Sequence, residues 1–294
     1  MTKGSRPTIL LGLIGAGIQA SLTPAMHERE AAAQGLREIY RLIDLDKLGL
    51  SVSVLPELLI AAERLGFDGL NITFPCKQAI IPLLHGLSED ARGLGSVNTV
   101  VLRDGRRTGH NTDCSGFAES FRRGLSDASL RLVVQLGAGG AGAAVAHAAL
   151  TLGTQQLSIF DTDTARAEQL TADLKVRFGP GRARTAGDLP AAMAQADGLI
   201  NATPVGMTKL PGMPLPASLL RPELWVADIV YFPLETELLR TARALGCRTL
   251  HGGGMAVFQA AGAFRLFTGI EPDAVRMLQH FAAMQTITSE ETTR

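Results

Sequence analysis

The sequence has no excess of charge of either sign, because its 28 basic and 28 acidic side chains cancel over 294 residues. Nucleic-acid-binding proteins usually carry a basic excess or a basic face, so this balance argues against a nucleic-acid partner. Charged residues make up only 19% of the chain and hydrophobic residues 46%. That apolar fraction excludes intrinsic disorder and predicts a folded globular protein.

Cysteines and long apolar runs are also scarce. Cys76, Cys114 and Cys247 are odd in number and far apart, so they form neither a disulfide framework nor a CxxC zinc pattern. The apolar run at residues 9–14 is too short for a signal peptide, and the one at 141–152 is too short for a bilayer span. We therefore expect a cytoplasmic protein without a membrane partner.

Motifs for metal, phosphate-hydrolysis and esterase chemistry are missing. No P-loop and no G-x-S-x-G segment occurs. The histidines lack metal-ligand spacing, so we expect structural roles and no metal site. They are His27, His85, His110, His147, His251 and His280.

Glycine is plentiful, with 32 residues, whereas aromatic residues make up only 5% of the chain, which favours an α/β architecture over a β-sandwich. In the second half, short apolar runs alternate with helical patterns, which is typical of a parallel sheet covered by helices on both faces. The expected strands are 132–136, 157–161, 198–202, 225–230 and 248–250, and the expected helices are 141–152, 164–176 and 235–245.

The first half is also β/α in character. We expect strands at 9–14, 38–43 and 69–73, helices at 24–34 and 55–65, and a hairpin of 97–102 and 107–110 around Asp104-Gly105. The length fits two domains. We expect an N-terminal α/β substrate domain at 1–113, a Rossmann-type cofactor domain at 114–251, and helices at 255–267 and 272–284 within a C-terminal segment, 252–294, that returns to the first domain.

Two glycine-rich turns follow apolar strands. Gly15-Ala16-Gly17-Ile18-Gln19-Ala20 lacks a third glycine, so we do not expect it to bind a dinucleotide. Gly137-Ala138-Gly139-Gly140-Ala141-Gly142 satisfies G-x-G-x-x-G between a strand and a helix. Its glycines would allow the tight turn, the approach of the pyrophosphate and close helix packing. The alternative is a glycine turn that only connects the two elements.

An acidic residue ends the next strand. Asp161 has nearly the spacing expected for the residue that accepts hydrogen bonds from the ribose hydroxyls and repels a 2′-phosphate. Asp163 adds negative charge, and the first basic residue, Arg166, comes five positions after Asp161. The sequence therefore predicts NAD rather than NADP as the cofactor.

Two polar segments of the first half could supply a proton-exchanging group. Asn71-Ile72-Thr73-Phe74-Pro75-Cys76-Lys77 ends a strand in a turn, and Gly109-His110-Asn111-Thr112-Asp113 comes just before the expected linker to the cofactor domain. Spacing alone does not distinguish Lys77 and Asp113 from a solvated lysine and a capping aspartate.

The order of these motifs resembles the shikimate dehydrogenase family over nearly the whole chain. The matching segments are Ser21-Leu22-Thr23-Pro24-Ala25-Met26-His27, Asn71 to Lys77, Gly95-Ser96-Val97-Asn98-Thr99, Asn111-Thr112-Asp113, Gly137 to Gly142, Asn201 to Met207, Asp228-Ile229-Val230-Tyr231, Met255 to Gln259, and Phe267-Thr268-Gly269.

The resemblance implies a role for individual residues. Lys77 and Asp113 would be the catalytic pair, with Lys77 exchanging the proton of the reacting hydroxyl. Ser21 and Thr23 would hold the substrate carboxylate, and Thr73, Asn98, Asp113 and Gln259 would bind the ring hydroxyls. Thr203 would line the nicotinamide side, with Tyr231 and Gly252 near the cleft.

Some positions resemble the NAD-dependent quinate/shikimate branch of the family. Thr23 stands where shikimate-specific members usually have serine, and Asp161 replaces the basic residues of NADP-using members. His251 and Gly254 stand where we expect an acid and often a basic residue. We expect a monomer or homodimer that oxidises quinate or shikimate with NAD. The alternatives are a shikimate-specific or otherwise specialised family member, and a non-catalytic sensor of quinate or shikimate.

Overall fold

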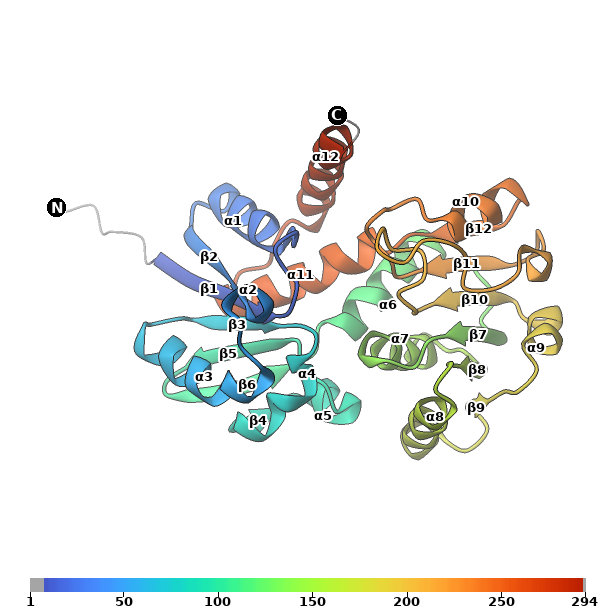
Figure 1. Cartoon of the computed structure of the whole chain (residues 1–294), viewed down its shortest axis with the longest axis horizontal. Helices are drawn as coiled ribbons and strands as arrows, with labels where there is room; N and C mark the ends of the chain where they lie inside the picture. The colour runs from blue at the N-terminus through green and yellow to red at the C-terminus, as the bar shows by residue number, and fades with distance from the viewer. Residues whose placement is uncertain (1–7, 293–294) are drawn as a thin grey trace. The chain divides into compact units, whose positions relative to one another are not determined.

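The computed structural model describes residues 8–292 and divides the chain into two compact units. One unit contains the chain as far as Thr112 together with the residues from Val257 onward, and the other is Asp113–Ala256. Each unit is built on its own six-stranded sheet (Figure 1). The α/β fold class predicted from the sequence is confirmed.

The sheet of the first unit has the strand order β2-β1-β3-β5-β6-β4. Its strands are β1 (Thr8–Gly15), β2 (Arg37–Asp44), β3 (Gly69–Ile72), β4 (Gly86–Leu87), β5 (Thr99–Arg103) and β6 (Arg106–His110). β1, β2 and β3 run parallel, whereas β5 is antiparallel to both of its neighbours. The carboxyl ends of β1, β2, β3 and β6 and the start of β5 therefore lie along one edge of the sheet.

Helices cover both faces of this sheet. One face packs on α2 (Leu45–Leu48), α3 (Leu55–Arg64), α4 (Cys76–Ala79) and α5 (Glu89–Leu94), and two 3₁₀ turns, η1 (Val52–Val54) and η2 (Ile81–Leu83), connect these helices. The other face packs on α1 (Thr23–Ala33) and on the part of α11 (Gly253–Thr268) that belongs to this unit. The final helix, α12 (Ala274–Thr292), contacts α1.

The sheet of the second unit is parallel throughout, in the order β12-β11-β10-β7-β8-β9. Its strands are β7 (Leu132–Leu136), β8 (Gln156–Phe160), β9 (Ala183–Thr185), β10 (Gly198–Asn201), β11 (Trp225–Asp228) and β12 (Arg248–Leu250). The chain passes from β7 to β8 on one side and later returns to β10 on the other. This reversal next to β7 is where open α/β sheets bind ligands.

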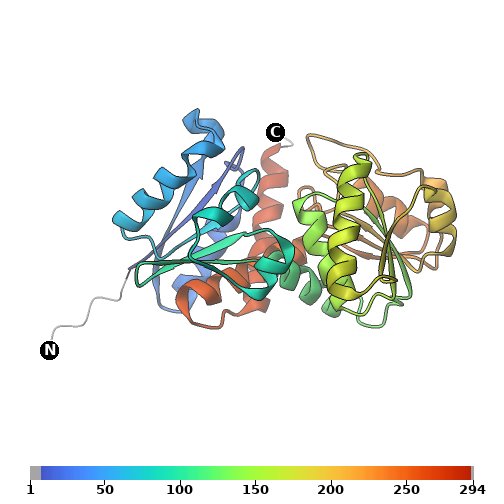
Figure 2. The ribbon, with the colours of Figure 1, turned by 90° about the horizontal axis from the view of Figure 1, so that it is seen from below.

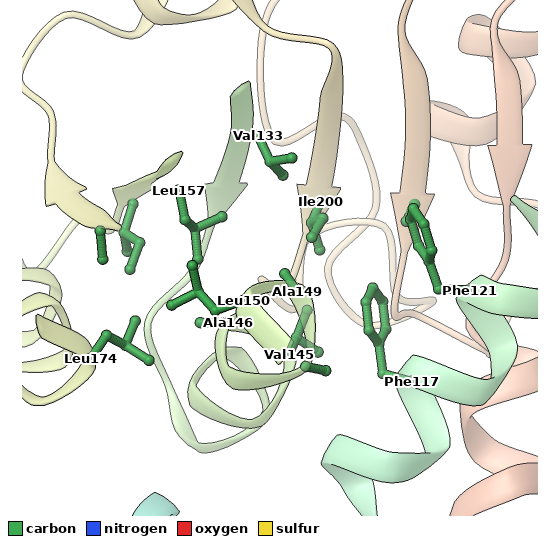
Figure 3. Packing of buried hydrophobic residues seen from close by; sticks show 14 of the residues in the cluster. Phe117, Phe121, Val133, Val145, Ala146, Ala149, Leu150, Leu157, Leu174 and Ile200 are labelled. Atoms are coloured by element: carbon green, nitrogen blue, oxygen red, sulfur yellow. The ribbon is translucent and has the colours of Figure 1, made fainter. Parts of the chain in front are cut away.

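Helices lie on both faces of the second unit's sheet (Figure 2), and an apolar layer is buried on each face. Residues of α6 (Asp113–Gly124), α7 (Gly140–Thr151) and α8 (Thr164–Phe178) form one layer, in which Phe117 and Phe121 of α6 and Val145 and Leu150 of α7 meet strand residues (Figure 3). The opposite layer comes from α9 (Leu189–Gln195), η3 (Ala217–Leu219) and α10 (Glu237–Ala244). The small side chains of α7 allow that helix to pack closely on the strands.

The structure confirms most of the elements predicted from the sequence and corrects one. β7 and β12 coincide with their predictions residue for residue, and positive φ angles at Asp104 (52°) and Gly105 (69°) confirm the hairpin turn. The linker expected after Asp113 is wrong, because Asp113 begins the twelve-residue helix α6. The apolar face of α6 is needed to cover the second sheet, so the chain enters that unit as a helix.

Candidate functional site

Most of the predicted substrate residues lie in the first unit, beside strand ends at one edge of its sheet, and Asp113 is the first residue of the second unit. The loop with Ser21 follows β1, the segment with Thr73 and Lys77 follows β3, Asn98 directly precedes β5, and Asp113 comes three residues after β6. Ligands of α/β sheets bind outside the carboxyl ends of the strands. The topology therefore brings these sequence-distant segments together.

The loop that carries Ser21 is organised by the buried carboxylate of Asp44, at the end of β2. Its oxygens accept hydrogen bonds from the backbone N–H groups of Gly17 (3.0 Å) and Ile18 (3.1 Å) and from the side-chain amide of Gln19 (2.9 Å). The Gln19 bond is the main cause that lowers the pKa of Asp44, so this carboxyl is ionised at neutral pH. Within the loop, Ser21 Oγ accepts from the N–H of Thr23 at 3.3 Å.

The segment after β3 turns sharply into the short helix α4. The N–H of Thr73 donates to the carbonyl of Ile14 (2.9 Å), and the Lys77 carbonyl accepts from the N–H of Val97 (2.9 Å). These bonds tie Thr73 to the end of β1 and Lys77 to the loop before β5, and the Lys77 side chain is half-buried. Cys76 is completely buried, and burial raises the pKa of its thiol, which is typical of a structural cysteine and not of a nucleophile.

Asn98 and Thr112 are joined by several hydrogen bonds. Asn98 Oδ1 accepts from the backbone N–H of Thr112 (2.9 Å), and Asn98 Nδ2 donates to Thr112 Oγ1 (2.9 Å). Both residues are buried. Because Asp113 directly follows Thr112, the amide of Asn98 fixes the backbone that presents Asp113. The other predicted residue of this unit, Gln259, lies half-buried on α11.

In the second unit, the glycine-rich turn connects β7 to α7. Gly137 has a φ of +96°, and a Cβ there would lie 2.6 Å from the carbonyl oxygen of Ala202. A Cβ on Gly142 would lie 2.4 Å from the carbonyl oxygen of Gly137. At Gly139 and Gly140, by contrast, a Cβ would meet no atom within 4 Å. The outer two of the motif's three glycines thus permit close backbone packing, while the middle one faces open space.

The start of α7 fits an anionic group. Gly139 precedes the helix and provides no side-chain hydrogen bond to its first turn, so the N–H groups of Gly140, Ala141 and Gly142 lack a capping side chain. Sequence reasoning missed Gln135, whose buried amide donates to the carbonyls of Gly137 and Gly142, both at 2.9 Å. Gln135 fixes the turn from beneath, and no motif signals this contact.

Asp161 lies directly beside the glycine-rich turn. Its Oδ2 accepts from the N–H of Ala138 (2.7 Å), and its Oδ1 accepts from the N–H of Asp163 (2.9 Å). Partial burial opposes ionisation, but these two donors and the charge of Arg166 outweigh it and lower the pKa of Asp161. The carboxylate is therefore charged at neutral pH, and each oxygen retains acceptor capacity for a ribose hydroxyl.

The surroundings of Asp161 differ in one respect from the sequence-based expectation. Arg166 is not remote, because its guanidinium lies 3.8 Å from Asp161 and 3.2 Å from Asp163. Asp163 begins α8 as its N-cap, accepting from the N–H of Arg166 at 3.2 Å. One helical turn brings the basic residue back toward the acid. Together, Asp161, Asp163 and Arg166 still carry a net charge of −1.

The turn after β10 and the end of β11 share a buried polar network. Asn201 Oδ1 accepts from the Thr203 hydroxyl (2.7 Å), and Asn201 Nδ2 donates to Asp228 (3.0 Å). Asp228 also accepts from the hydroxyl of Thr236 (2.7 Å). Burial raises the pKa of Asp228 to about 6 against these donors. Thr203, predicted on the nicotinamide side, is thereby fixed at the carboxyl edge of the sheet.

Gly252 and Tyr231 lie at the same edge of the second sheet. A Cβ on Gly252 would lie 2.2 Å from the carbonyl oxygen of Ile229, so the loops after β11 and β12 touch. Tyr231 is 44% exposed, and partial desolvation and, after it, the negative charge of Asp113 raise the pKa of its phenol. His251 Nδ1 accepts from the N–H of Gly253 at 3.1 Å and so caps the start of α11.

Two further features bear on function. Within residues 8–292, no three histidine, cysteine or acidic side chains gather where they could hold a metal ion. Over the same residues, no helix has the length and apolar character needed to cross a bilayer.

Comparisons with known proteins agree with this architecture. Residues 13–100 match the model of the shikimate dehydrogenase substrate binding domain. A protein of Streptomyces avermitilis named shikimate dehydrogenase (NADP(+)) is 60% identical over 95% of this chain and 97% of its own length. A protein of Corynebacterium efficiens named quinate/shikimate dehydrogenase (NAD(+)) is 51% identical over 94% of this chain and 99% of its own length.

A solved structure of a related dehydrogenase is also similar to this chain. Quinate dehydrogenase from Corynebacterium glutamicum in complex with NAD has a TM-score of 0.89 and 50% identity, covering 94% of this chain and 99% of its own. The relatives' names differ in the cofactor, NADP or NAD, but agree in the family. Matches of this identity over nearly the whole length establish that this chain belongs to the shikimate dehydrogenase family.

Proposed function

We propose that this protein is an NAD-dependent oxidoreductase that converts the hydroxyl group of quinate or shikimate to a ketone, reversibly. The first unit would bind the substrate and the second the dinucleotide. Family membership and the relatives' names support the reaction class. The open space at Gly139 and the uncapped start of α7 support dinucleotide binding by the second unit.

The observation that carries the choice of NAD is the charged carboxylate of Asp161 beside the glycine-rich turn. Asp161 is hydrogen-bonded to Ala138, so a ribose bound at this turn would meet it. A carboxylate favours ribose hydroxyls and repels a 2′-phosphate. Arg166 reduces this repulsion, but Asp163 shares its charge, and the net negative charge remains.

A second candidate is an NADP-dependent shikimate dehydrogenase. The observation in its favour is the half-exposed guanidinium of Arg166, 3.8 Å from Asp161, which could meet a 2′-phosphate after a change of rotamer. The relative that is 60% identical carries this name. The two candidates predict opposite orders of kcat/KM for the two cofactors.

A four-way kinetic assay decides between the candidates. Quinate and shikimate would each be tested with NAD and with NADP, following the absorbance of the reduced nicotinamide. We expect kcat/KM to be higher with NAD. Higher values with NADP would select the second candidate, and no turnover in any combination would reject both.

The role of Asp161 is tested by removing its charge while keeping its shape. Asp161→Asn retains an oxygen for the Ala138 N–H, and we expect the NAD-to-NADP ratio of kcat/KM to fall about tenfold, the effect of one hydrogen bond to a charged group. Asp163→Asn is the matched control, because it removes a neighbouring charge that has no bond to the glycine-rich turn. An equal change in both variants would indicate a general field effect.

For the substrate side, Lys77 would accept the proton of the reacting hydroxyl, with Asp113 as its catalytic partner. When bound, NAD supplies the acceptor for the hydride. Ser21 and Thr23 would bind the substrate carboxylate. The ring hydroxyls would be bound by Thr73, Asn98, Asp113 and Gln259, with Tyr231 nearby.

Lys77→Ala tests this assignment. We expect kcat to fall by more than about 100-fold, the usual contribution of a general acid–base group, while NAD binding measured by calorimetry is retained. Retention is expected because Lys77 and the glycine-rich turn belong to different units. Lys47→Ala, on the surface helix α2, is the control and should have normal kinetics. Near-normal turnover of Lys77→Ala would contradict the proposal.

A further inference from the structure

We infer that Tyr40 is a positioning residue that orients Asn98 and the Thr112–Asp113 backbone through Asn71 and Thr99. The inference rests on the proposed function, in which Asn98 and Asp113 bind the substrate. Tyr40 lies in β2 and is 5% exposed, and neither the motifs nor the family resemblance point to it.

The first contact crosses a strand. Tyr40 and Asn71 lie on β2 and β3, which are separated by β1 in the sheet. The Tyr40 hydroxyl nevertheless donates to Asn71 Oδ1 at 2.6 Å, in the interior of the unit. Burial, and after it the charge of Glu38, raises the pKa of Tyr40 well above its usual value, so the phenol is protonated at neutral pH. Tyr40 can therefore donate this hydrogen bond.

The next contacts cross from β3 to β5. With its oxygen engaged by Tyr40, the Asn71 amide directs Nδ2 to the Thr99 hydroxyl (3.1 Å) and to the carbonyl of Asn98 (3.2 Å). Asn71 and Thr99 are direct partners in the β3–β5 ladder, which holds the two side chains opposite each other. All of these groups are buried, so none can exchange its partner for bulk water without a local opening.

The last contacts reach the proposed site. Thr99 accepts from Asn71, so its single hydroxyl proton is directed to Asn98 Oδ1, at 2.9 Å. Asn98 Oδ1 also accepts from the N–H of Thr112, and Nδ2 donates to Thr112 Oγ1. The side-chain donors thus run from Tyr40 through Asn71, Thr99 and Asn98 to Thr112 Oγ1, and the backbone N–H of Thr112 donates back to Asn98 Oδ1. Loss of the first donor leaves the Asn71 amide without the partner that sets its orientation.

The alternative is a purely structural role, in which Tyr40 only fills the core. Its ring does contact His27, with centroids 5.1 Å apart, and apolar neighbours from β1 and α11. Phenylalanine would satisfy that role, because it keeps the ring. The two roles therefore differ in a single oxygen atom, and Tyr40→Phe separates them.

The experiment compares Tyr40→Phe, Thr99→Val and the double variant. We expect each single variant to lower kcat/KM for quinate or shikimate about tenfold, the effect of one buried hydrogen bond, with an unchanged Kd for NAD. Because both substitutions interrupt the same chain of bonds, the double variant should have a kcat/KM no lower than that of the more impaired single variant. Normal kcat/KM in Tyr40→Phe, or effects that multiply in the double variant, would overturn the inference.

A matched variant controls for lost stability. Ser88→Ala removes the hydrogen bond from the N–H of Ala91 that caps α5, in the same unit but outside this chain of bonds. It should lower the melting temperature to a similar extent without changing kcat/KM. A parallel fall in kcat/KM would show that instability alone explains the effect of Tyr40→Phe, and would also overturn the inference.

A readout that needs no activity separates this inference from the proposed function. The N–H of Thr112 donates to Asn98 Oδ1, so its hydrogen exchange reports on the orientation of Asn98. We expect exchange at Thr112 to accelerate about tenfold in Tyr40→Phe and Thr99→Val and not in Ser88→Ala. Accelerated exchange in a protein inactive on every substrate would reject the proposed function alone. Unchanged exchange in an active protein would reject the positioning role alone.

Discussion

Replacement of Gly142 by alanine tests the fit of α7 against the glycine-rich turn. The added Cβ would lie 2.4 Å from the carbonyl oxygen and 2.9 Å from the carbonyl carbon of Gly137. These are backbone atoms, and Gly137 is itself pressed against the Ala202 carbonyl, where a Cβ would lie at 2.6 Å. The turn therefore has no side chain that could move to make room, so the start of α7 must shift.

The cost follows from two opposing terms. Overpacking of a close contact costs about 1–3 kcal/mol, whereas alanine in place of glycine within a helix gains about 0.5–1 kcal/mol. The net loss is about 1–2 kcal/mol, which lowers the melting temperature of a domain of this size by roughly 2–8 °C. A shift of α7 also moves the N–H groups of its first turn, so the Kd for NAD should rise about tenfold or more.

The assay is thermal unfolding and NAD calorimetry on matched variants. Gly140→Ala is the control, because it lies in the same helical turn and its Cβ would meet no atom within 4 Å. We expect Gly140→Ala to melt at the wild-type temperature or slightly above it. If Gly142→Ala melted as high as Gly140→Ala, the close approach of α7 to the turn would not be a constraint on stability.

Three further predictions concern single residues. Gly139→Ala should leave the melting temperature unchanged, since its Cβ meets no atom within 4 Å, yet raise the Kd for NAD by calorimetry about tenfold; equal affinity would mean that the pyrophosphate lies elsewhere. Asp228 has a pKa of about 6 in the folded protein and a lower one in the unfolded protein, so its protonation stabilises the fold. This stabilisation is fully present below about pH 4 and is lost as the pH rises through 6. The free energy of unfolding of Asp228→Asn, measured in urea, should therefore rise relative to that of wild type by up to about 3 kcal/mol between pH 4 and pH 7. A difference between the two proteins that stays constant with pH would contradict this. Asp44→Asn should raise the KM for quinate or shikimate several-fold by loosening the loop of Ser21, with an unchanged Kd for NAD; an unchanged KM would show that the loop holds its form without the charge.

The parts of the fold that the sequence predicts well are those specified by local pattern. β7 is an apolar run interrupted by Gln135 and followed by glycine, and α7 is rich in alanine, so both have strong local signals. The hairpin turn at Asp104-Gly105 needs positive φ angles that this pair readily adopts. The elements missed include α9 and β9, which are short, and the longer helix α6. α6 contains two glycines and forms where Phe117 and Phe121 can be buried, a requirement visible only in three dimensions.

The candidate site divides in the same way. Gly137 and Gly142 can be identified in the sequence because the backbone geometry of the turn restricts the residue type, whereas Lys77 is assigned through the family resemblance. Residues that support the motifs cannot be identified in this way, because their contacts connect distant positions. Tyr40 is 31 residues from Asn71, and Asp44 is 26 residues from Ile18. Any polar residue could occupy such positions on sequence evidence alone, and only the sheet order brings the partners together.

The two glycine-rich turns show why similar sequences need not have similar functions. Both follow a buried parallel strand and present backbone N–H groups at its carboxyl end. In the first, an internal anion already occupies those groups, because the Asp44 carboxylate accepts from Gly17 and Ile18. In the second, the Asp161 carboxylate accepts from one N–H of the turn, that of Ala138, and the N–H groups at the start of α7 receive no side-chain cap. A dinucleotide phosphate would be repelled at the first turn and attracted at the second, so we expect only the second turn to bind the cofactor.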